Sequence, residues 1–250
     1  MMEQDIQLRQ KAFNQLQQFL AECKITGYQS KKILEIGFKN GLFVDECQKA
    51  GLIPAGLEIN KEYYEKVKAR FPYLDLIWYD GATIPVSDNS FDFVVSFQVL
   101  EHVSSTEHMF DECIRILKLG GIMYHVCPNY HSFYEGHYNI IWLPFLNKAA
   151  GRLYLKLLWR FTPYFESLNL IKPGLAAKAL KKYKDITIIS LGRREFVNNF
   201  NEEQIDKVGQ KFLRKILKFL LRLPLFKKAI LGFIVVTNLY YPITVIVRKN

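Results

Sequence analysis

Short apolar runs alternate with amphipathic segments over the first half of the chain. The run from Lys32 to Gly37 is apolar and ends at a glycine, whereas residues 4–22 place their apolar side chains at helical spacing. The pattern predicts strands over 32–37, 53–59, 74–79, 91–97 and 122–127, and helices over 4–22, 42–50, 61–70 and 105–118. Such alternation is typical of parallel sheets covered by helices on both faces. The predicted fold class is therefore α/β.

The alternation breaks after Pro128. Residues 129–170 are rich in aromatic and turn-forming side chains and contain one basic, helix-like stretch at 148–160. Beyond them the pattern predicts a helix over 173–183, a strand over 185–191, largely helical and very apolar segments over 202–240, and a last strand over 241–247. Half of the 250 residues are hydrophobic and 23% are charged, which excludes a disordered chain and fits one packed domain.

The turn after the first predicted strand carries the first sign of chemistry. Gly37 and Gly41 flank it, and glycines there let a ligand approach the backbone at the positive end of the next helix. Glu58 ends the second strand, where a carboxylate can accept hydrogen bonds from ribose hydroxyls, and Asp80 ends the third. The Gly37-x3-Gly41 spacing departs from the GxGxxG fingerprint of dinucleotide sites. These residues predict a crevice for a nucleoside-type cofactor other than a dinucleotide.

Five motifs in this half of the chain occur in the order of a known enzyme family. They are ILEIG at 33–37, GLE at 56–58, YDG at 79–81, IPVSDNSFDFVVSFQVLEHV at 84–103 and LKLGG at 117–121. The stretch 32–121 closely resembles the class I S-adenosylmethionine-dependent methyltransferases, in particular the type-11 group. The resemblance implies a Rossmann-like, mostly parallel sheet of seven strands with helices on both faces, an antiparallel last strand and a helical insertion before it.

The resemblance also implies S-adenosyl-L-methionine as the cofactor and gives roles to individual residues. Glu35, Gly37, Phe38 and Gly41 would contact the methionine part of the cofactor, and Phe97 and Gln98 would close the pocket beneath it. Glu58 and Ile59 would contact the ribose, and Asp80 and Gly81 the adenine. One position departs from the family pattern. Lys39 stands where the family usually has glycine, so its side chain must point away from the cofactor or contact the cofactor's carboxylate.

Under this interpretation residues 1–250 are a single methyltransferase domain with four parts. These are an N-terminal helical cap (1–30), a cofactor-binding core (31–127), a substrate-side insertion (128–183) and a basic, apolar helical insertion (201–240).

Histidines beyond the fourth and fifth strands are the candidate catalytic residues. Methyl transfer from a sulfonium needs no metal, and an oxygen acceptor mainly needs a base, for which His102, His131 and His137 are placed where the crevice opens. Packing or structural hydrogen bonding is the alternative for each. The spacing His131-x3-Glu135-x-His137 would also suit a metal, but no second feature supports it and we expect none. The four cysteines lack CxxC spacing, so neither disulfides nor structural zinc are predicted.

The net charge of +10 is spread unevenly. Residues 1–127 hold 13 basic and 17 acidic side chains, whereas residues 128–250 hold 21 and 7. Residues 211–228 combine a basic helical face with a wide apolar one, a pattern typical of helices on anionic membranes, with a core helix bearing solvated lysines as the alternative. Bulky aliphatic side chains between the cations disfavour nucleic acid. Residues 229–247 are uncharged, but Asn238 and Pro242 interrupt them, so we expect the last strand there rather than a membrane span.

These features together predict a methyltransferase that acts at a membrane surface on a lipid-linked or hydrophobic acceptor, for example by O-methylation of a glycan. Two alternatives stay open: a methyltransferase of a soluble small molecule whose C-terminal helices form a dimer interface or a lid, and a non-catalytic, membrane-associated binding module. The acidic, polar start predicts no signal peptide, so we expect a cytoplasmic location with peripheral membrane contact through 211–228. No pattern indicates an oligomeric state.

Overall fold

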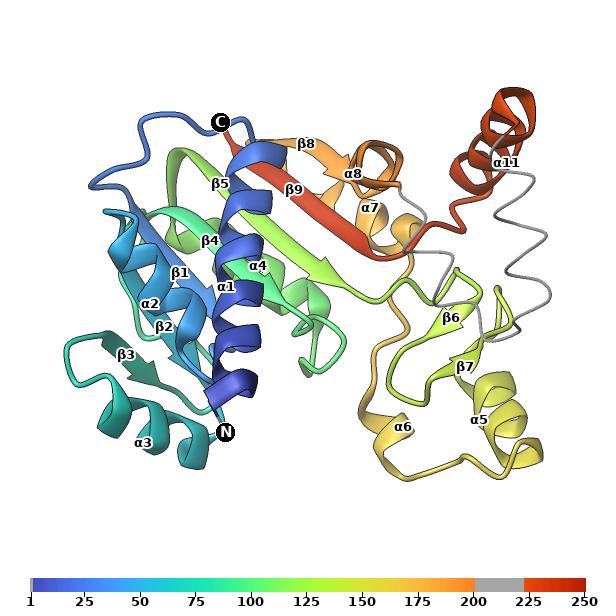
Figure 1. Ribbon diagram of the computed structural model, residues 1–250, viewed down its shortest axis with the longest axis horizontal. Coiled ribbons are helices and arrows are strands. Elements are labelled where there is room, and N and C mark those ends of the chain that lie inside the picture. Colours follow the sequence, from blue (N-terminus) through green and yellow to red (C-terminus); the bar gives the residue numbers. More distant parts are fainter. Residues whose placement is uncertain (1, 201–222) are drawn as a thin grey trace.

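A seven-stranded sheet forms the centre of the computed structural model, which describes residues 2–200 and 223–250 (Figure 1). The strand order is β3-β2-β1-β4-β5-β9-β8. The bounds are β1 (Lys32–Ile36), β2 (Ile53–Glu58), β3 (Asp75–Trp78), β4 (Phe91–Phe97), β5 (Leu117–Cys127), β8 (Ile186–Leu191) and β9 (Ile243–Lys249). Neighbouring strands from β3 to β5 are parallel, and β9 is antiparallel to both β5 and β8. The predicted mostly parallel sheet with an antiparallel last strand is confirmed.

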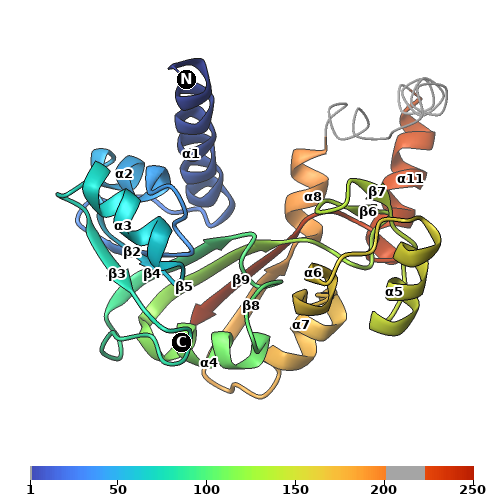
Figure 2. The same ribbon diagram turned by 90° about the horizontal axis from the view of Figure 1, so that it is seen from below.

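Helices cover both faces of this sheet (Figure 2). One face carries α1 (Met2–Glu22), α2 (Leu42–Lys49) and α3 (Lys61–Arg70), and the other carries α4 (Thr106–Ile116) and α7 (Pro173–Leu180). On the first face Phe19 of α1 is fully buried, with its ring 5.4 Å from that of Phe93 and 5.2 Å from that of Tyr124. On the second face Phe110 of α4 and Leu180 of α7 are buried in one cluster. The two layers explain why the central strands are apolar on both sides.

Local sequence determines where the helices begin. Asn60 accepts a hydrogen bond from the Tyr63 amide at the start of α3 (3.0 Å), and Ser105 accepts one from the His108 amide at the start of α4 (3.1 Å). Helix α2 instead begins after Gly41, whose φ of 71° is left-handed. A glycine turn, rather than a capping side chain at that position, therefore leads from β1 into α2.

Residues 128–172 form a lobe beyond the carboxyl end of β5, on the right of Figures 1 and 2. It contains the hairpin β6 (Tyr134–Glu135) and β7 (Ile140–Ile141), followed by α5 (Lys148–Leu157) and α6 (Tyr164–Ser167). The lobe has its own small core, in which the buried side chains are Tyr130, Trp142, Leu155, Phe165 and Leu168. The sequence did not predict the hairpin or α6, because elements of two to four residues are too short to show a period. The helix α7 (Pro173–Leu180), which the sequence analysis had grouped with the insertion 128–183, packs with α4 on the main sheet, so the lobe ends at residue 172.

The C-terminal part of the sheet follows the predicted order. Strands β8 and β9 confirm the strands expected at 185–191 and 241–247, and α8 (Arg193–Asn199) and α11 (Pro224–Val236) lie between them. None of the helices that the structure describes is both long and apolar enough to cross a bilayer. Residues 229–247 divide between α11, a turn and the buried strand β9, which confirms the strand expected there. Residues 201–222 lie outside the described part of the chain. They include more than half of the predicted basic insertion (201–240) and most of the predicted basic helix (211–228).

Candidate active site

The glycine turn lies at the carboxyl edge of the sheet, directly after β1. Gly37 has a φ of 77° and Gly41 one of 71°, a left-handed conformation that side chains rarely adopt. A Cβ on Gly37 would lie 2.6 Å from Cγ2 of Val99, and one on Gly41 would lie 2.4 Å from Cγ1 of Val67. Both conformation and space therefore require glycine at these two positions.

Glu58 ends β2 and holds this turn. Its Oε2 accepts a hydrogen bond from the Lys39 amide (3.0 Å) and its Oε1 accepts one from the Asn60 amide (2.9 Å). Each carboxylate oxygen keeps a further acceptor lone pair, so the side chain can also accept hydrogen bonds from two vicinal hydroxyls. Lys39 is exposed with a φ of 44°, so the departure from glycine keeps the left-handed backbone and leaves the side chain accessible to solvent.

Glu35 lies within β1, close enough to Glu58 for the two charges to interact. It is buried, and among the described residues its Oε2 has no hydrogen-bond partner. Burial, reinforced by the charge of Glu58, raises the pKa of Glu35 well above its ordinary value. A buried carboxylate without a donor is unfavourable, and a bound ammonium group would remove that cost. The sequence identified both carboxylates but not the electrostatic coupling between them.

Replacing Glu35 with glutamine is expected to stabilise the ligand-free protein above about pH 5, because the pKa of Glu35 is higher in the folded than in the unfolded chain. The folded state holds the extra proton between these two pKa values, so stability falls as pH rises through that window, and the uncharged variant does not share this fall. The Tm advantage of Glu35→Gln should grow with pH, with about 2–4 °C for each kcal/mol. Thermal unfolding across pH checks this, with exposed Glu65→Gln as the control. Parallel pH dependences of the parent and Glu35→Gln would contradict it.

Asp80 and Gly81 follow β3 and lie beside Ile59. Gly81 has a φ of 88°, and a Cβ there would lie 2.7 Å from Cδ1 of Ile59. Ile59 is 57% exposed, and the exposed Asp80 carboxylate accepts a hydrogen bond from the Ala82 amide (2.9 Å). The three residues together offer apolar surface next to a hydrogen-bond acceptor, which suits a flat ring with an amino group.

Three further predicted residues differ in their exposure. Phe38 is buried, and its Cδ1 would lie 2.7 Å from a Cβ on Gly56, so its side chain belongs to the core and only its backbone to the turn. Phe97 is half-buried, with its ring 5.0 Å from that of Phe43 in an edge-on arrangement. Gln98 is exposed with a φ of 58°. Of the three side chains, those of Phe97 and Gln98 are accessible to a ligand.

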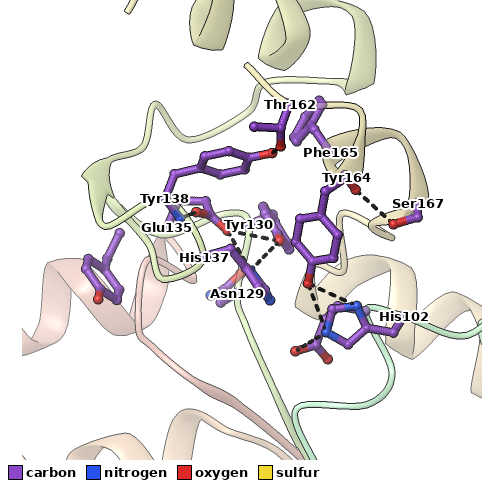
Figure 3. Close-up of polar contacts among 12 residues, drawn as sticks. His102, Asn129, Tyr130, Glu135, His137, Tyr138, Thr162, Tyr164, Phe165 and Ser167 are labelled. Atoms are coloured by element: carbon purple, nitrogen blue, oxygen red, sulfur yellow. Dashed lines mark hydrogen bonds and ion pairs between the residues drawn. The ribbon is translucent and has the colours of Figure 1, made fainter. Parts of the chain in front are cut away.

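The candidate histidines divide into a pair and a single residue. His102 and His137 meet where the sheet edge joins the lobe, with their rings 5.4 Å apart and nearly perpendicular. The hydroxyl of Tyr164 lies 3.5 Å from each ring nitrogen of His102 (Figure 3). His131 instead packs its ring against that of Phe145 at 4.4 Å. The sequence placed all three histidines at this edge but could not show which of them meet.

Glu135 orients His137 from the hairpin (Figure 3). Its carboxylate lies 2.8 Å from Nδ1 of His137, and it accepts hydrogen bonds from the Tyr138 amide (2.7 Å) and the Tyr130 hydroxyl (3.2 Å). The hydrogen bond with Glu135 raises the pKa of His137. Burial, followed by the nearby charge of His137, lowers the pKa of His102.

Glu101 and Tyr164 lie beside His102, although the sequence pattern pointed to neither of them. The side chain of Glu101 is fully buried, and among the described residues neither carboxylate oxygen has a hydrogen-bond partner. This burial raises the pKa of Glu101 to about 7. The Asn169 amide donates a hydrogen bond to the Glu101 carbonyl (2.7 Å) and ties the lobe to the turn after β4. The only signal in the sequence was the position of Glu101 beside His102 in the motif LEHV.

Comparison with known proteins agrees with this architecture. Residues 34–125 match a family model described as a methyltransferase domain. A protein of Mycolicibacterium smegmatis named "Probable S-adenosylmethionine-dependent methyltransferase" is 32% identical over 106 residues, which are 42% of this chain and 41% of that protein. The chain thus spans less than half the length of that curated relative.

Two solved structures share the fold. The S-adenosylmethionine-dependent methyltransferase from Mesorhizobium loti has a TM-score of 0.58 at 13% identity, with 91% of this chain and 95% of that one covered. A Haemonchus contortus phosphoethanolamine N-methyltransferase in complex with S-adenosylhomocysteine has a TM-score of 0.53 at 16% identity, with 90% and 50% covered. The strand order, the glycine turn and the match of residues 34–125 to the family model agree, so this part of the chain is a methyltransferase domain similar to those of S-adenosylmethionine-dependent enzymes.

Proposed function

We propose that this chain binds S-adenosylmethionine at the carboxyl edge of the sheet and catalyses transfer of its methyl group to an acceptor held between that edge and the lobe. The cofactor supplies a methyl group activated on a sulfonium. The observation that carries the proposal is the buried Oε2 of Glu35, which has no partner among the described residues and lies on the strand leading into a turn with two left-handed glycines. Such an oxygen fits the ammonium group of an amino acid.

The other polar groups of this edge fit the rest of the cofactor. Glu58 would accept hydrogen bonds from the two ribose hydroxyls while it keeps its bonds to the Lys39 and Asn60 amides. Asp80 would accept from the adenine amino group, and the exposed side chain of Ile59 would pack on the adenine ring. These contacts hold the cofactor in one orientation, which an in-line displacement requires.

The acceptor group would approach from the side of the lobe. His102 and His137 lie there as a pair, and Glu135 fixes the orientation of His137. Because Asn169 bonds to the backbone of both Glu101 and Val103, the lobe holds the turn after β4 in place. We propose that the two histidines contact the acceptor. Phe145 covers one side of His131, which would therefore line the edge of the acceptor site.

We further propose that the acceptor is lipid-linked or otherwise hydrophobic and is met at a membrane surface. Helices α5 and α11 lie at the same end of the molecule in both views (Figures 1 and 2). This end exposes large apolar side chains, among them Leu153, Leu157, Trp159, Leu225, Phe226, Phe233 and Val236. The exposed cations Lys156, Arg160, Lys227 and Lys228 accompany them. Apolar side chains next to cations suit contact with anionic lipid.

Removing two of these apolar side chains should weaken vesicle binding. Trp159 is 95% exposed and Leu225 81% exposed, so replacing both with alanine leaves the packed core unchanged. Burial of a large apolar side chain contributes about 1.5–3 kcal/mol, so we expect at least about a tenfold loss of binding to phosphatidylglycerol vesicles in flotation assays. Leu119→Ala, which also removes an exposed apolar side chain but lies at the start of β5, is the control. Equal flotation of the double variant and the parent would contradict membrane contact through these helices.

A soluble acceptor would give a different set of results. In that alternative the exposed apolar surface forms a dimer interface, which sedimentation without detergent detects. Incubation with S-adenosylmethionine labelled on its methyl group, in the presence of membrane lipid extract or of a soluble metabolite extract, separates the two substrate classes. Label in the lipid fraction supports the proposal, and label only in the aqueous fraction supports the soluble alternative. Absence of label from both fractions, despite cofactor binding, favours the non-catalytic module.

A further inference from the structure

Glu101, His102 and His137 have the composition and spacing of a divalent-metal site. One ligand atom from each residue lies within 4.8 Å of the other two, and Nε2 of His102 lies 3.9 Å from Oε1 of Glu101. Two imidazoles and one carboxylate are an established ligand set for catalytic zinc and for non-haem iron. Donor atoms on one tetrahedral zinc ion lie about 3–3.5 Å apart, so adjustments of about 1 Å would suffice for coordination.

The unpartnered carboxylate of Glu101 is an independent indication of a cation. Its side chain is fully buried, and neither oxygen meets a hydrogen-bond donor in the part of the chain that the structure describes. A buried anion of this kind is costly unless a counter-charge accompanies it. No lysine or arginine is paired with it among the described residues, while the side chain of His102 is 37% exposed and gives a path from solvent.

The environment of His137 is also that of a metal ligand. Glu135 engages Nδ1 at 2.8 Å, which leaves Nε2 as the free ring nitrogen. Metal-bound histidines usually have their other nitrogen held by a carboxylate or carbonyl, which fixes the ring and raises its basicity. The Tyr130 hydroxyl, donating to Glu135, fixes that carboxylate in turn.

We propose that Glu101, His102 and His137 bind a divalent cation of the zinc class and leave an open coordination position toward the acceptor. The three residues lie close to the glycine turn after β1, because Val99, two residues before Glu101, packs against Gly37. A cation there would orient an acceptor oxygen and lower its pKa. That role rests on the proposed function, whereas the metal site itself does not. His131, part of the spacing seen in the sequence, is not a ligand in this proposal.

Titration of the metal-free full-length chain with Co²⁺ tests the proposal without any assay of methyl transfer. We expect visible absorption typical of four- or five-coordinate Co²⁺, saturation at one equivalent, and displacement by Zn²⁺. Glu101→Gln, which preserves size and removes the charge, and His137→Ala should each weaken binding at least about 100-fold. Glu135→Gln, which acts only through His137, should weaken it about 10- to 100-fold. His108→Ala, an exposed histidine outside the cluster, should bind as the parent does.

Three results would overturn the metal site. They are a parent chain that gives no such absorption, binding that survives in both Glu101→Gln and His137→Ala, and binding that is lost in His108→Ala. Circular dichroism of each variant confirms that it is folded. Titration of the same metal-free protein with S-adenosylmethionine reports on the proposed function separately. Cofactor binding without a Co²⁺ signal would refute only the metal site, and the reverse would refute only the cofactor site.

Discussion

Trp142→Ala is expected to destabilise the lobe by about 3–5 kcal/mol, the usual loss when a fully buried tryptophan is truncated. The Trp142 side chain has no exposed surface, and its ring lies 5.8 Å from that of Tyr130, 6.0 Å from that of Tyr154 and 6.1 Å from that of Phe165. A Cβ on Gly151 would lie 2.8 Å from the indole of Trp142, which shows how closely the side chains around it are packed. Neighbouring side chains could therefore fill the cavity left by truncation only if the backbone moved. Unfolding of this small core would release the hairpin that carries Glu135.

Hydrogen exchange combined with denaturant unfolding measures this effect. We expect amides of the lobe to lose protection in Trp142→Ala while amides of β1, β4 and β5 keep theirs, because the lobe core is a separate cluster. Trp159→Ala is a matched control, since Trp159 is 95% exposed and its truncation should cost less than about 0.5 kcal/mol. Similar stability changes in the two variants would contradict a packed lobe core around Trp142.

Glu58→Ala should weaken S-adenosylmethionine binding at least about 100-fold. Two hydrogen bonds from ribose hydroxyls to a carboxylate contribute about 1.5–3 kcal/mol each, and their sum corresponds to a loss of this size or larger. The variant also removes the acceptor for the Lys39 and Asn60 amides, so the glycine turn should loosen as well.

Two further variants separate these effects. Glu58→Gln keeps one acceptor oxygen and should lose less affinity than Glu58→Ala. Glu65→Ala, on the exposed surface of α3, should bind the cofactor as the parent does. Each variant must first show a folded circular dichroism spectrum. An affinity of Glu58→Ala within about threefold of the parent would place the ribose elsewhere.

The first half of the fold was predictable because short apolar runs alternate there with amphipathic segments of helical spacing. The first four strands and the first four helices lie within two residues of their predicted ranges, whereas β5 begins at Leu117, five residues before its predicted start. The glycine turn was equally predictable, since the left-handed conformation at Gly37 and Gly41 leaves few other residues possible. Local patterns therefore sufficed wherever the chain buries regular elements on the sheet.

The acceptor side was not predictable in the same way. The pairing of His102 with His137 joins the turn after β4 to a hairpin of two-residue strands, which no period marks. Glu101 looks like an ordinary polar residue in the sequence, and only its complete burial without a partner shows that it is unusual. The spacing of His131, Glu135 and His137, from which no metal was expected, brings only Glu135 and His137 into contact, because the ring of His131 packs against that of Phe145. Contacts between residues far apart in the sequence determine which side chains come together on the acceptor side.

Glu35, Glu58 and Asp80 at the carboxyl edge of the sheet are the residues that we propose bind S-adenosylmethionine. Calorimetric titration of the full chain with S-adenosylmethionine, beside Glu58→Ala, measures this binding. We expect saturable binding at one site per chain, with S-adenosylhomocysteine competing for that site and Glu58→Ala losing at least about 100-fold in affinity. A folded parent chain that binds neither molecule would show that this edge is not a cofactor site.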